Sequence, residues 1–254
     1  LFGDGTHVTT GTLQNTGILQ FGDVPTDSLI FENGIFATGQ SAIYLQGIPR
    51  TYGSPVVLGD SDTIVYVYSG TSIIDTTYGS GGSGSFPNGA NITIGGHIEG
   101  VSGAGGENLT FIAGLAGDVT VGGNAGLTNR LGIFLVQSAN DVTVNNVTAQ
   151  RFDQTTGTGT TTTNGTINTN TGLAVNTDNY APNDVLTGSG TRSVTMGVNL
   201  LTTHIVINGL ITTTNGGVQL LATVGGVATA TNVGVVTLNN NGIINSDLDV
   251  IMQG

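Results

Sequence analysis

The chain contains no cysteine and no tryptophan, and only 4 of its 254 residues are lysine or arginine. Without cysteine it forms neither disulfide bonds nor thiolate metal sites. Clusters of basic residues bind phosphates, so their scarcity excludes nucleic acid as a partner and disfavours an anionic membrane surface. No apolar run approaches the roughly 18 residues of a transmembrane helix, so we expect no membrane insertion in this segment.

Charged residues of both signs are also scarce, at 8% of the chain, whereas about 25% is usual. The 37% of hydrophobic residues nevertheless distinguish the chain from a solvated disordered polymer. Threonine, asparagine, serine and 43 glycines make up most of the remainder. Threonine favours strands, while glycine and asparagine favour turns, so this composition predicts many short strands joined by tight turns.

A short alternating run closed by glycine or asparagine recurs along the chain. Its clearest copies are Asn91–Gly96, Asp118–Gly123, Asp141–Asn146 and His204–Gly209. Period-two alternation over four or five residues predicts a strand with one buried face. The first three copies start at residues 91, 118 and 141, which are 27 and 23 residues apart, and the fourth starts 63 residues later, close to three further units. A period in the low twenties indicates a repeat architecture.

Further strands are expected between these copies, at residues 109–112, 133–136, 173–175, 194–196 and 235–238. Two or three short strands per unit build one coil of a β-solenoid. One coil cannot bury its inward face alone, but coils stacked about 4.8 Å apart pair their backbones and enclose a continuous apolar column. The predicted fold is therefore all-β, a right-handed parallel β-helix, with about ten or eleven coils in a rod roughly 50 Å long.

The first 90 residues fit this period less clearly. Similar phrases at 12–17, 28–34 and 42–47 lie about 16 residues apart, which indicates smaller coils or a hairpin-rich cap. We divide the chain into a less regular N-terminal section or cap, or early coils, over 1–78, a flexible Gly/Ser loop over 79–90, and regular coils over 91–254. Residues 63–68 predict a strong strand, and the threonine-rich stretch 155–166 is interpreted as a threonine-faced strand rather than a loop.

From residue 72 onward, several phrases together resemble the repeat regions of filamentous-haemagglutinin-like large exoproteins. The phrases are Ile74–Thr77, Asn91–Ile94, Glu107–Thr110, Asn129–Gly132, Gln137–Thr143, Val147–Ala149 and Ile211–Val218. The resemblance implies a right-handed β-helix within a giant secreted bacterial protein that serves in adhesion or surface structure. It implies no catalytic residue, and the first 70 residues depart from its pattern.

Many enzymes that cleave polysaccharides also use the β-helix fold, and a chain that shared their activity would carry their catalytic motifs. Asn176–Asp178 matches the first motif of polygalacturonase-like enzymes by its letters, but no adjacent Asp pair and no Arg-x-Lys exists, and Gly95–His97 is not the expected histidine motif. Glycoside hydrolysis needs two carboxylates that flank the bond. A turn role is therefore favoured for Asn176 and Asp178.

Lyase chemistry needs carboxylates that bind Ca²⁺ and a basic proton acceptor, and the basic candidates Arg50, Arg130, Arg151 and Arg192 are scattered. The histidines, at positions 7, 97 and 204, are too far apart for a local zinc motif. Asp60/Asp62 and Asp247/Asp249 each place two carboxylates on one side of an extended chain, too few for a calcium site. We predict no catalytic, cofactor or metal residues.

We predict a structural or adhesive segment of a secreted or cell-surface bacterial exoprotein, a rigid rod or filament subunit that is not an enzyme. The alternatives are a β-helical polysaccharide lyase or glycoside hydrolase, and a tailspike-like trimer. The expected partners are further copies associated head to tail or a larger parent chain, because Val250–Gly254 reads like mid-strand. Carbohydrate or a host surface is the expected ligand. Turn asparagines, at positions 145, 208, 215 and 239–241, are expected to form hydrogen bonds from coil to coil.

Overall fold

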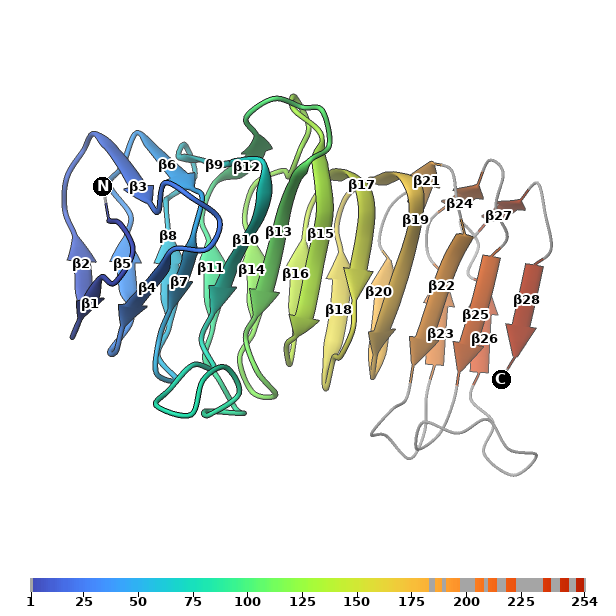
Figure 1. Ribbon diagram of the computed structural model, residues 1–254. Coiled ribbons are helices and arrows are strands. Elements are labelled where there is room, and N and C mark those ends of the chain that lie inside the picture. Colours follow the sequence, from blue (N-terminus) through green and yellow to red (C-terminus); the bar gives the residue numbers. More distant parts are fainter. Residues whose placement is uncertain are drawn as a thin grey trace.

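The protein consists of short parallel strands stacked side by side (Figure 1). The computed structural model describes residues 2–182 and the strand segments 186–188, 191–196, 204–207, 210–213, 218–222, 235–238, 243–246 and 250–253, with side chains described for 2–178. Within these described residues there is no helix. All strand pairs that they form are parallel. The all-β prediction is confirmed, and the stacking of parallel strands is consistent with a β-helix.

The strands form three sheets, which we call large, middle and small. The large sheet has 14 strands: β1 (His7–Val8), β4 (Ser28–Phe31), β7 (Ile48–Arg50), β10 (Gly70–Asp75), β13 (Glu107–Ile112), β15 (Leu131–Ser138), β17 (Val147–Gln154), β19 (Ile167–Thr177), β21 (Leu186–Gly188), β22 (Thr191–Met196), β24 (Leu210–Thr213), β25 (Val218–Ala222), β27 (Ile243–Ser246) and β28 (Val250–Gln253). The middle sheet has 10: β2 (Gly11–Leu13), β5 (Ile35–Ala37), β8 (Val56–Leu58), β11 (Ile92–Ile94), β14 (Val119–Val121), β16 (Val142–Val144), β18 (Thr160–Thr163), β20 (Asn179–Pro182), β23 (His204–Ile207) and β26 (Val235–Leu238). The small sheet has 4: β3 (Ile18–Phe21), β6 (Ala42–Leu45), β9 (Ile64–Val67) and β12 (His97–Gly100).

The chain visits the sheets in turn, so neighbouring strands of one sheet come from consecutive windings. Along one edge of the middle sheet, backbone N–H groups donate to the side chain one winding earlier. Asp118 donates to Asn91, Asp141 to Asp118 and Thr160 to Asp141, over sequence separations of 27, 23 and 19 residues. The predicted strands at 91, 118 and 141 are therefore confirmed, and they lie side by side in one sheet. Two strands, β18 and β20, lie between β16 and β23, so the gap to residue 204 spans three windings as predicted.

The other predicted strands also form. Residues 63–68 contain β9, residues 155–166 contain β18, and the segments predicted between the repeats fall within β13, β15, β19, β22 and β26. The phrases at 12–17, 28–34 and 42–47 fall on β2, β4 and β6, which belong to three different sheets. In this N-terminal section, each strand pairs with the strand of the same sheet one full winding later. Ser28 N likewise donates a hydrogen bond to Asp4 Oδ1, which lies 24 residues earlier in the chain.

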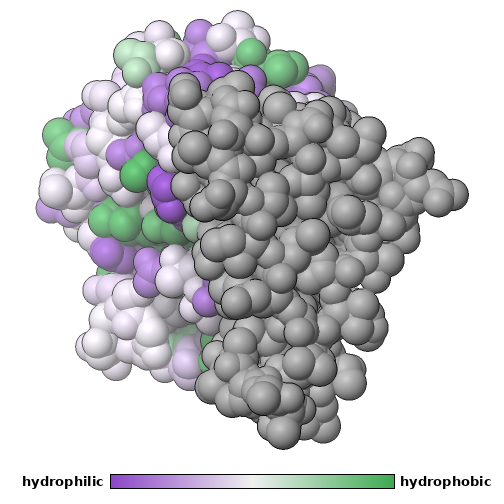
Figure 2. Space-filling model, turned by 90° about the vertical axis from the view of Figure 1, so that its right-hand side faces the viewer, coloured by the Kyte–Doolittle hydropathy of each residue, from purple (hydrophilic) through white to green (hydrophobic). Residues whose placement is uncertain are grey.

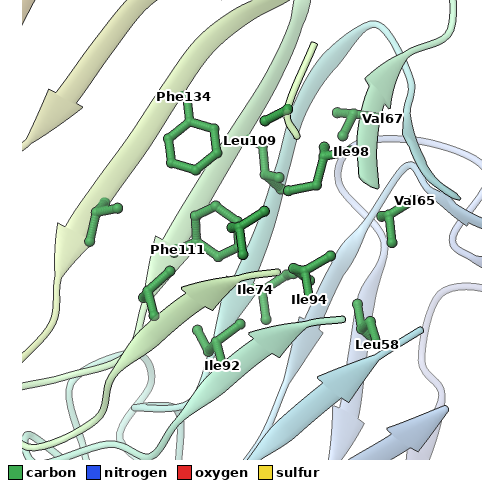
Figure 3. Packing of buried hydrophobic residues seen from close by; sticks show 14 of the residues in the cluster. Leu58, Val65, Val67, Ile74, Ile92, Ile94, Ile98, Leu109, Phe111 and Phe134 are labelled. Carbon is green, nitrogen blue, oxygen red and sulfur yellow. The ribbon is translucent and has the colours of Figure 1, made fainter. Parts of the chain in front are cut away.

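Aliphatic side chains from successive windings point inward and form one continuous core (Figure 3). In the middle sheet the register aligns Ile35, Val56, Ile92, Val119 and Val142, all fully buried. Each such side chain stabilises the fold by about 1.5 to 3 kcal/mol relative to an exposed one. In the large sheet, the rings of Phe111, Phe134 and Phe152 follow one another at centroid distances of 5.3 Å.

The turns between the middle and small sheets pack too closely for side chains in two successive windings. A Cβ on Gly122 would lie 2.6 Å from the carbonyl oxygen of Gly95, closer than atoms approach, so glycine is required there. In the next winding Asn145 replaces this glycine, and its Nδ2 donates to Gly122 O at 2.7 Å. The expected coil-to-coil hydrogen bond of Asn145 is confirmed. The corresponding predictions for Asn208, Asn215 and Asn239–Asn241 lie outside the described residues.

At β18 two inward positions of the otherwise mostly apolar interior are polar. Thr161 and Thr163 occupy the inward positions that Val142 and Val144 hold one winding earlier, and both are fully buried. The Thr161 hydroxyl donates to Gln154 Oε1 at 2.5 Å and lies 3.2 Å from Thr177 Oγ1. The predicted threonine-faced strand therefore turns half of its threonines inward.

Candidate functional site

The outer face of the small sheet carries a column of aromatic side chains. Strand alternation turns Leu45 and Val67 into the core and leaves Tyr44 and Tyr66 outside, where both are half-buried. The two tyrosines are register partners on neighbouring strands, and their rings stack with a centroid distance of 5.2 Å and an interplanar angle of 18°. The ring centroid of Tyr68 lies 5.7 Å from that of Tyr44. Such pairs contribute about 0.5 to 1.5 kcal/mol beyond their buried area, so they hold the rings in place.

Next to this column the small sheet ends and a cavity opens. After β12 the sheet continues only as single-residue bridges from Ile98 to Ala125 and from Ala125 to Val147. The chain beyond Ala125 forms no further strand of this sheet, and residues 127–129, which we call the second wall, line the cavity together with Tyr66. The cavity measures about 300 Å³ and is lined by Ile64, Tyr66, His97, Glu99, Asn124, Leu127, Thr128 and Asn129.

Glu99 holds the second wall in position. Its side chain is only 7% exposed, and its carboxylate accepts hydrogen bonds from the backbone N–H of Thr128 at 3.1 Å and of Asn129 at 2.7 Å. Hydrogen bonds to a charged acceptor are stronger than neutral ones. Among the described side chains the ion pairs are His7–Glu32 and Arg151–Asp153, so Glu99 has no cationic partner there.

His97 and Asn124 are held by bonds that also orient their remaining polar atoms. His97 Nδ1 accepts a hydrogen bond from Asn124 N at 3.0 Å, so Nε2 carries the proton of the neutral ring. Asn124 Oδ1 accepts from Asn146 Nδ2 at 2.8 Å, which leaves the Asn124 amide group as a donor. Both residues line the cavity together with Glu99, and their side-chain N–H groups are the donors that remain for a ligand.

A second cavity, of about 320 Å³, lies beside the Gly/Ser loop that joins β10 to β11. Its lining includes Thr77, Gly84, Pro87 and Leu115. The Thr77 hydroxyl donates to Asp75 Oδ1 at 2.7 Å and accepts from Gly84 N at 3.0 Å, so the loop is bonded to the strand that precedes it.

Aromatic packing also attaches this loop to the body of the molecule. Phe86 stacks on Tyr52 with a centroid distance of 5.9 Å, and the Arg50 guanidinium lies 4.6 Å from the centroid of the Tyr78 ring. These contacts account for Tyr52, Tyr78, Phe86 and Arg50 as parts of one packed cluster, which we call the loop cluster.

The middle sheet presents a regular polar face. Thr93, Thr120, Thr143 and Thr162 are register partners on four successive strands, and all are half-buried on the outer side. On the part of the surface that Figure 2 shows in colour, hydrophobic residues occur in small groups among polar ones. Threonine side chains therefore form a row along the outer side of this sheet.

The residues considered for catalysis are held in structural contacts. Thr177 and Asp178 are 0% and 1% exposed, and Asn176 Nδ2 donates to Thr155 O at 3.0 Å. Arg130 Nη1 donates to the backbone carbonyl of Asn168 at 3.2 Å, and burial lowers the pKa of this guanidinium. Arg151 pairs with Asp153 at 2.6 Å.

The histidines and acidic pairs are dispersed over the molecule. His7 bonds Glu32 at 2.9 Å on an exposed surface, far in sequence from His97. Asp60 and Asp62 are close enough for a hydrogen bond between their carboxyl groups, which together with the Thr63 hydroxyl lowers the pKa of Asp60. Within the described part of the chain, no three His, Asp or Glu side chains are grouped to hold a metal ion. The side chains of Arg192 and His204 and the pair Asp247/Asp249 lie outside the described residues.

Comparisons with known proteins find no match among protein-family models, curated proteins or solved structures. The resemblance to haemagglutinin-like exoproteins therefore stays a prediction. A search of the described residues finds no helix with the length and apolarity to cross a membrane.

Proposed function

We propose that this chain is a segment of a right-handed parallel β-helix from a secreted or cell-surface bacterial exoprotein, and that it serves as a rigid adhesive rod rather than an enzyme. The observation that carries the proposal is the continuous core, which runs from Leu19 to Val175 through aligned windings. Crossovers between parallel strands of one sheet are almost always right-handed, which supports the proposed hand.

An adhesive role is supported by what the rod displays. The outer face of its middle sheet carries a row of threonines, and the small sheet adds a cavity lined by Tyr66. Binding sites on rigid strands need little ordering when a ligand arrives. The proposed partners are carbohydrate or another host surface, and further copies or a parent chain that pair with edge strands such as β1, β2 and β3.

Electron microscopy of the purified chain tests the rod. At about 4.8 Å per winding, particles should be roughly 50 Å long, either single or joined end to end. Round particles without a long axis would contradict the proposal.

Adhesion is tested with beads coated with the folded chain on surfaces of galactan, mannan or chitin. Retention above that of beads coated with heat-unfolded chain is expected. The same supernatants should contain no new reducing ends and no unsaturated uronates, since either product would favour the alternative of a polysaccharide hydrolase or lyase.

A further inference from the structure

We infer that the cavity on the small sheet binds a neutral saccharide through one pyranose ring. This inference rests on the proposed adhesive function, because it assigns a ligand class to one site of the rod. The cavity volume of about 300 Å³ lies at the lower end of the range for small-molecule sites, which suits one or two sugar rings.

The walls of the cavity match the apolar face of a sugar ring. Tyr66 forms part of one wall, and stacking on Tyr44 fixes its ring, so a flat surface is available without loss of side-chain freedom. Leu127 also lines the cavity and is 58% exposed, which is unusual for a leucine in this chain. A pyranose carries C–H groups on its ring faces, so it can contact both an aromatic and an aliphatic surface of the cavity.

The polar atoms of the cavity match hydroxyl groups. The amide group of Asn124 and the Nε2–H of His97 donate, while the Glu99 carboxylate has lone pairs beyond those that accept from Thr128 and Asn129. A ligand that meets both kinds of group must donate and accept hydrogen bonds over a short distance. Vicinal hydroxyl groups do so.

The charge of the cavity and of the whole chain favours neutral sugars over anionic ones as the ligand. No lysine or arginine lines the cavity, Glu99 is acidic, and the whole chain carries a net charge of −12. Uronates, sialic acids and phosphates would therefore be repelled. A cation is not required either, because backbone N–H groups already compensate the Glu99 carboxylate.

Saturation-transfer NMR on the full chain tests the inference with galactose, mannose, glucose and N-acetylglucosamine as neutral probes, and glucuronate and glucosamine as charged ones. At least one neutral sugar should bind, and glucuronate should bind more weakly. Tyr66→Ala should weaken binding by roughly tenfold and Leu127→Ala by a few fold, because each removes one apolar wall. Tyr66→Phe should retain most of the affinity.

Tyr52→Ala is the matched control, since it removes a half-buried tyrosine from the loop cluster and should leave sugar binding unchanged. Thermal unfolding of each variant checks that the fold is intact. Leu127→Ala should leave the melting temperature nearly unchanged, because Leu127 is exposed. No binding of any neutral sugar, preference for glucuronate or glucosamine, or an equal loss in Tyr52→Ala would overturn the inference. Bead adhesion that persists in Tyr66→Ala would overturn this site alone and leave the adhesive rod standing.

Discussion

The aliphatic windings, which contain β11, β14 and β16, and the threonine winding, which contains β18, fill the same inward positions with different chemistry. Val142 and Val144 face the core in one, and Thr161 and Thr163 replace them in the next, in unbroken register. The backbone pairing between windings is the same on both sides of this boundary. The comparison teaches that winding depends on pairing and turns, while the interior side chains set how stable each winding is.

The largest effect is expected in the aromatic row of the large sheet. Phe134→Ala should lower the free energy of unfolding by about 3 to 5 kcal/mol, because Phe111 and Phe152 would face a cavity. This loss is measured by urea unfolding, with circular dichroism as the signal. Ile133→Ala, at the neighbouring outward position, is the control and should cost far less, since Ile133 is 39% exposed. Equal losses would show that Phe134 does not pack in the core.

A smaller loss is expected in the polar interior. Thr161→Val should destabilise the protein by about 1 to 3 kcal/mol although it restores the aliphatic column, because Gln154 Oε1 would lose its donor in a buried site. The same urea titration measures this change. A gain in stability would mean that the hydrogen bond contributes less than an apolar contact.

Replacement of Thr163, two residues later, is expected to raise the free energy of unfolding instead of lowering it. The Thr163 hydroxyl is fully buried and has no hydrogen-bond partner among the described residues, so Thr163→Val should stabilise the protein by about 1 to 2 kcal/mol. The reverse exchange one winding earlier, Val144→Thr, is the matched control and should destabilise it. If Thr163→Val also destabilises the protein, the hydroxyl has a partner such as an internal water.

The smallest effect concerns pH and the buried carboxylate of Glu107. Burial of Glu107 favours the neutral acid, but hydrogen bonds from Ser102 and Gly106 outweigh it and lower the pKa below its ordinary value. A lowered pKa means that this stabilisation is present above the unfolded-state pKa of about 4.3 and is lost as pH falls through the folded-state pKa.

Glu107→Gln should therefore lower the melting temperature at pH 7 and shrink the difference between pH 7 and pH 3. Asp23→Asn, at an exposed carboxylate, serves as the control and should change neither value noticeably. An unchanged pH dependence in Glu107→Gln would show that its hydrogen bonds do not favour the ionised form.

The strands could be predicted where alternation is strict. The runs at 91, 118 and 141 each place valine or isoleucine on both sides of a threonine, so β11, β14 and β16 follow directly from the pattern. The threonine run 155–166 could be assigned to a strand, yet its polarity gave no sign that Thr161 and Thr163 face inward, because the hydrogen bond to Gln154 depends on the folded turn.

The cavity could not be predicted from the sequence. Its two sides come from β9 and β12 and from residues 124–129, and the bond that joins Glu99 to Asn129 spans 30 residues. No local motif marks such a pair. The stacking of Tyr44 on Tyr66 likewise depends on the winding length, which the irregular early repeats obscure. The sequence signal for the tyrosine column is the alternation of inward and outward positions in Ala42–Leu45 and Ile64–Val67, because it places both tyrosines on the outer face.

Disulfide formation between introduced cysteines tests the central claim that one winding follows another in register across the boundary between the two interiors. The chain has no native cysteine, and Thr143 and Thr162 are outward register partners on β16 and β18. Thr143→Cys combined with Thr162→Cys should form a disulfide readily under mild oxidation, since the partners lie about 4.8 Å apart. Thr120→Cys combined with Thr162→Cys, two windings apart, should not. Rapid crosslinking of the 120/162 pair, or none in the 143/162 pair, would contradict the stacked-winding structure.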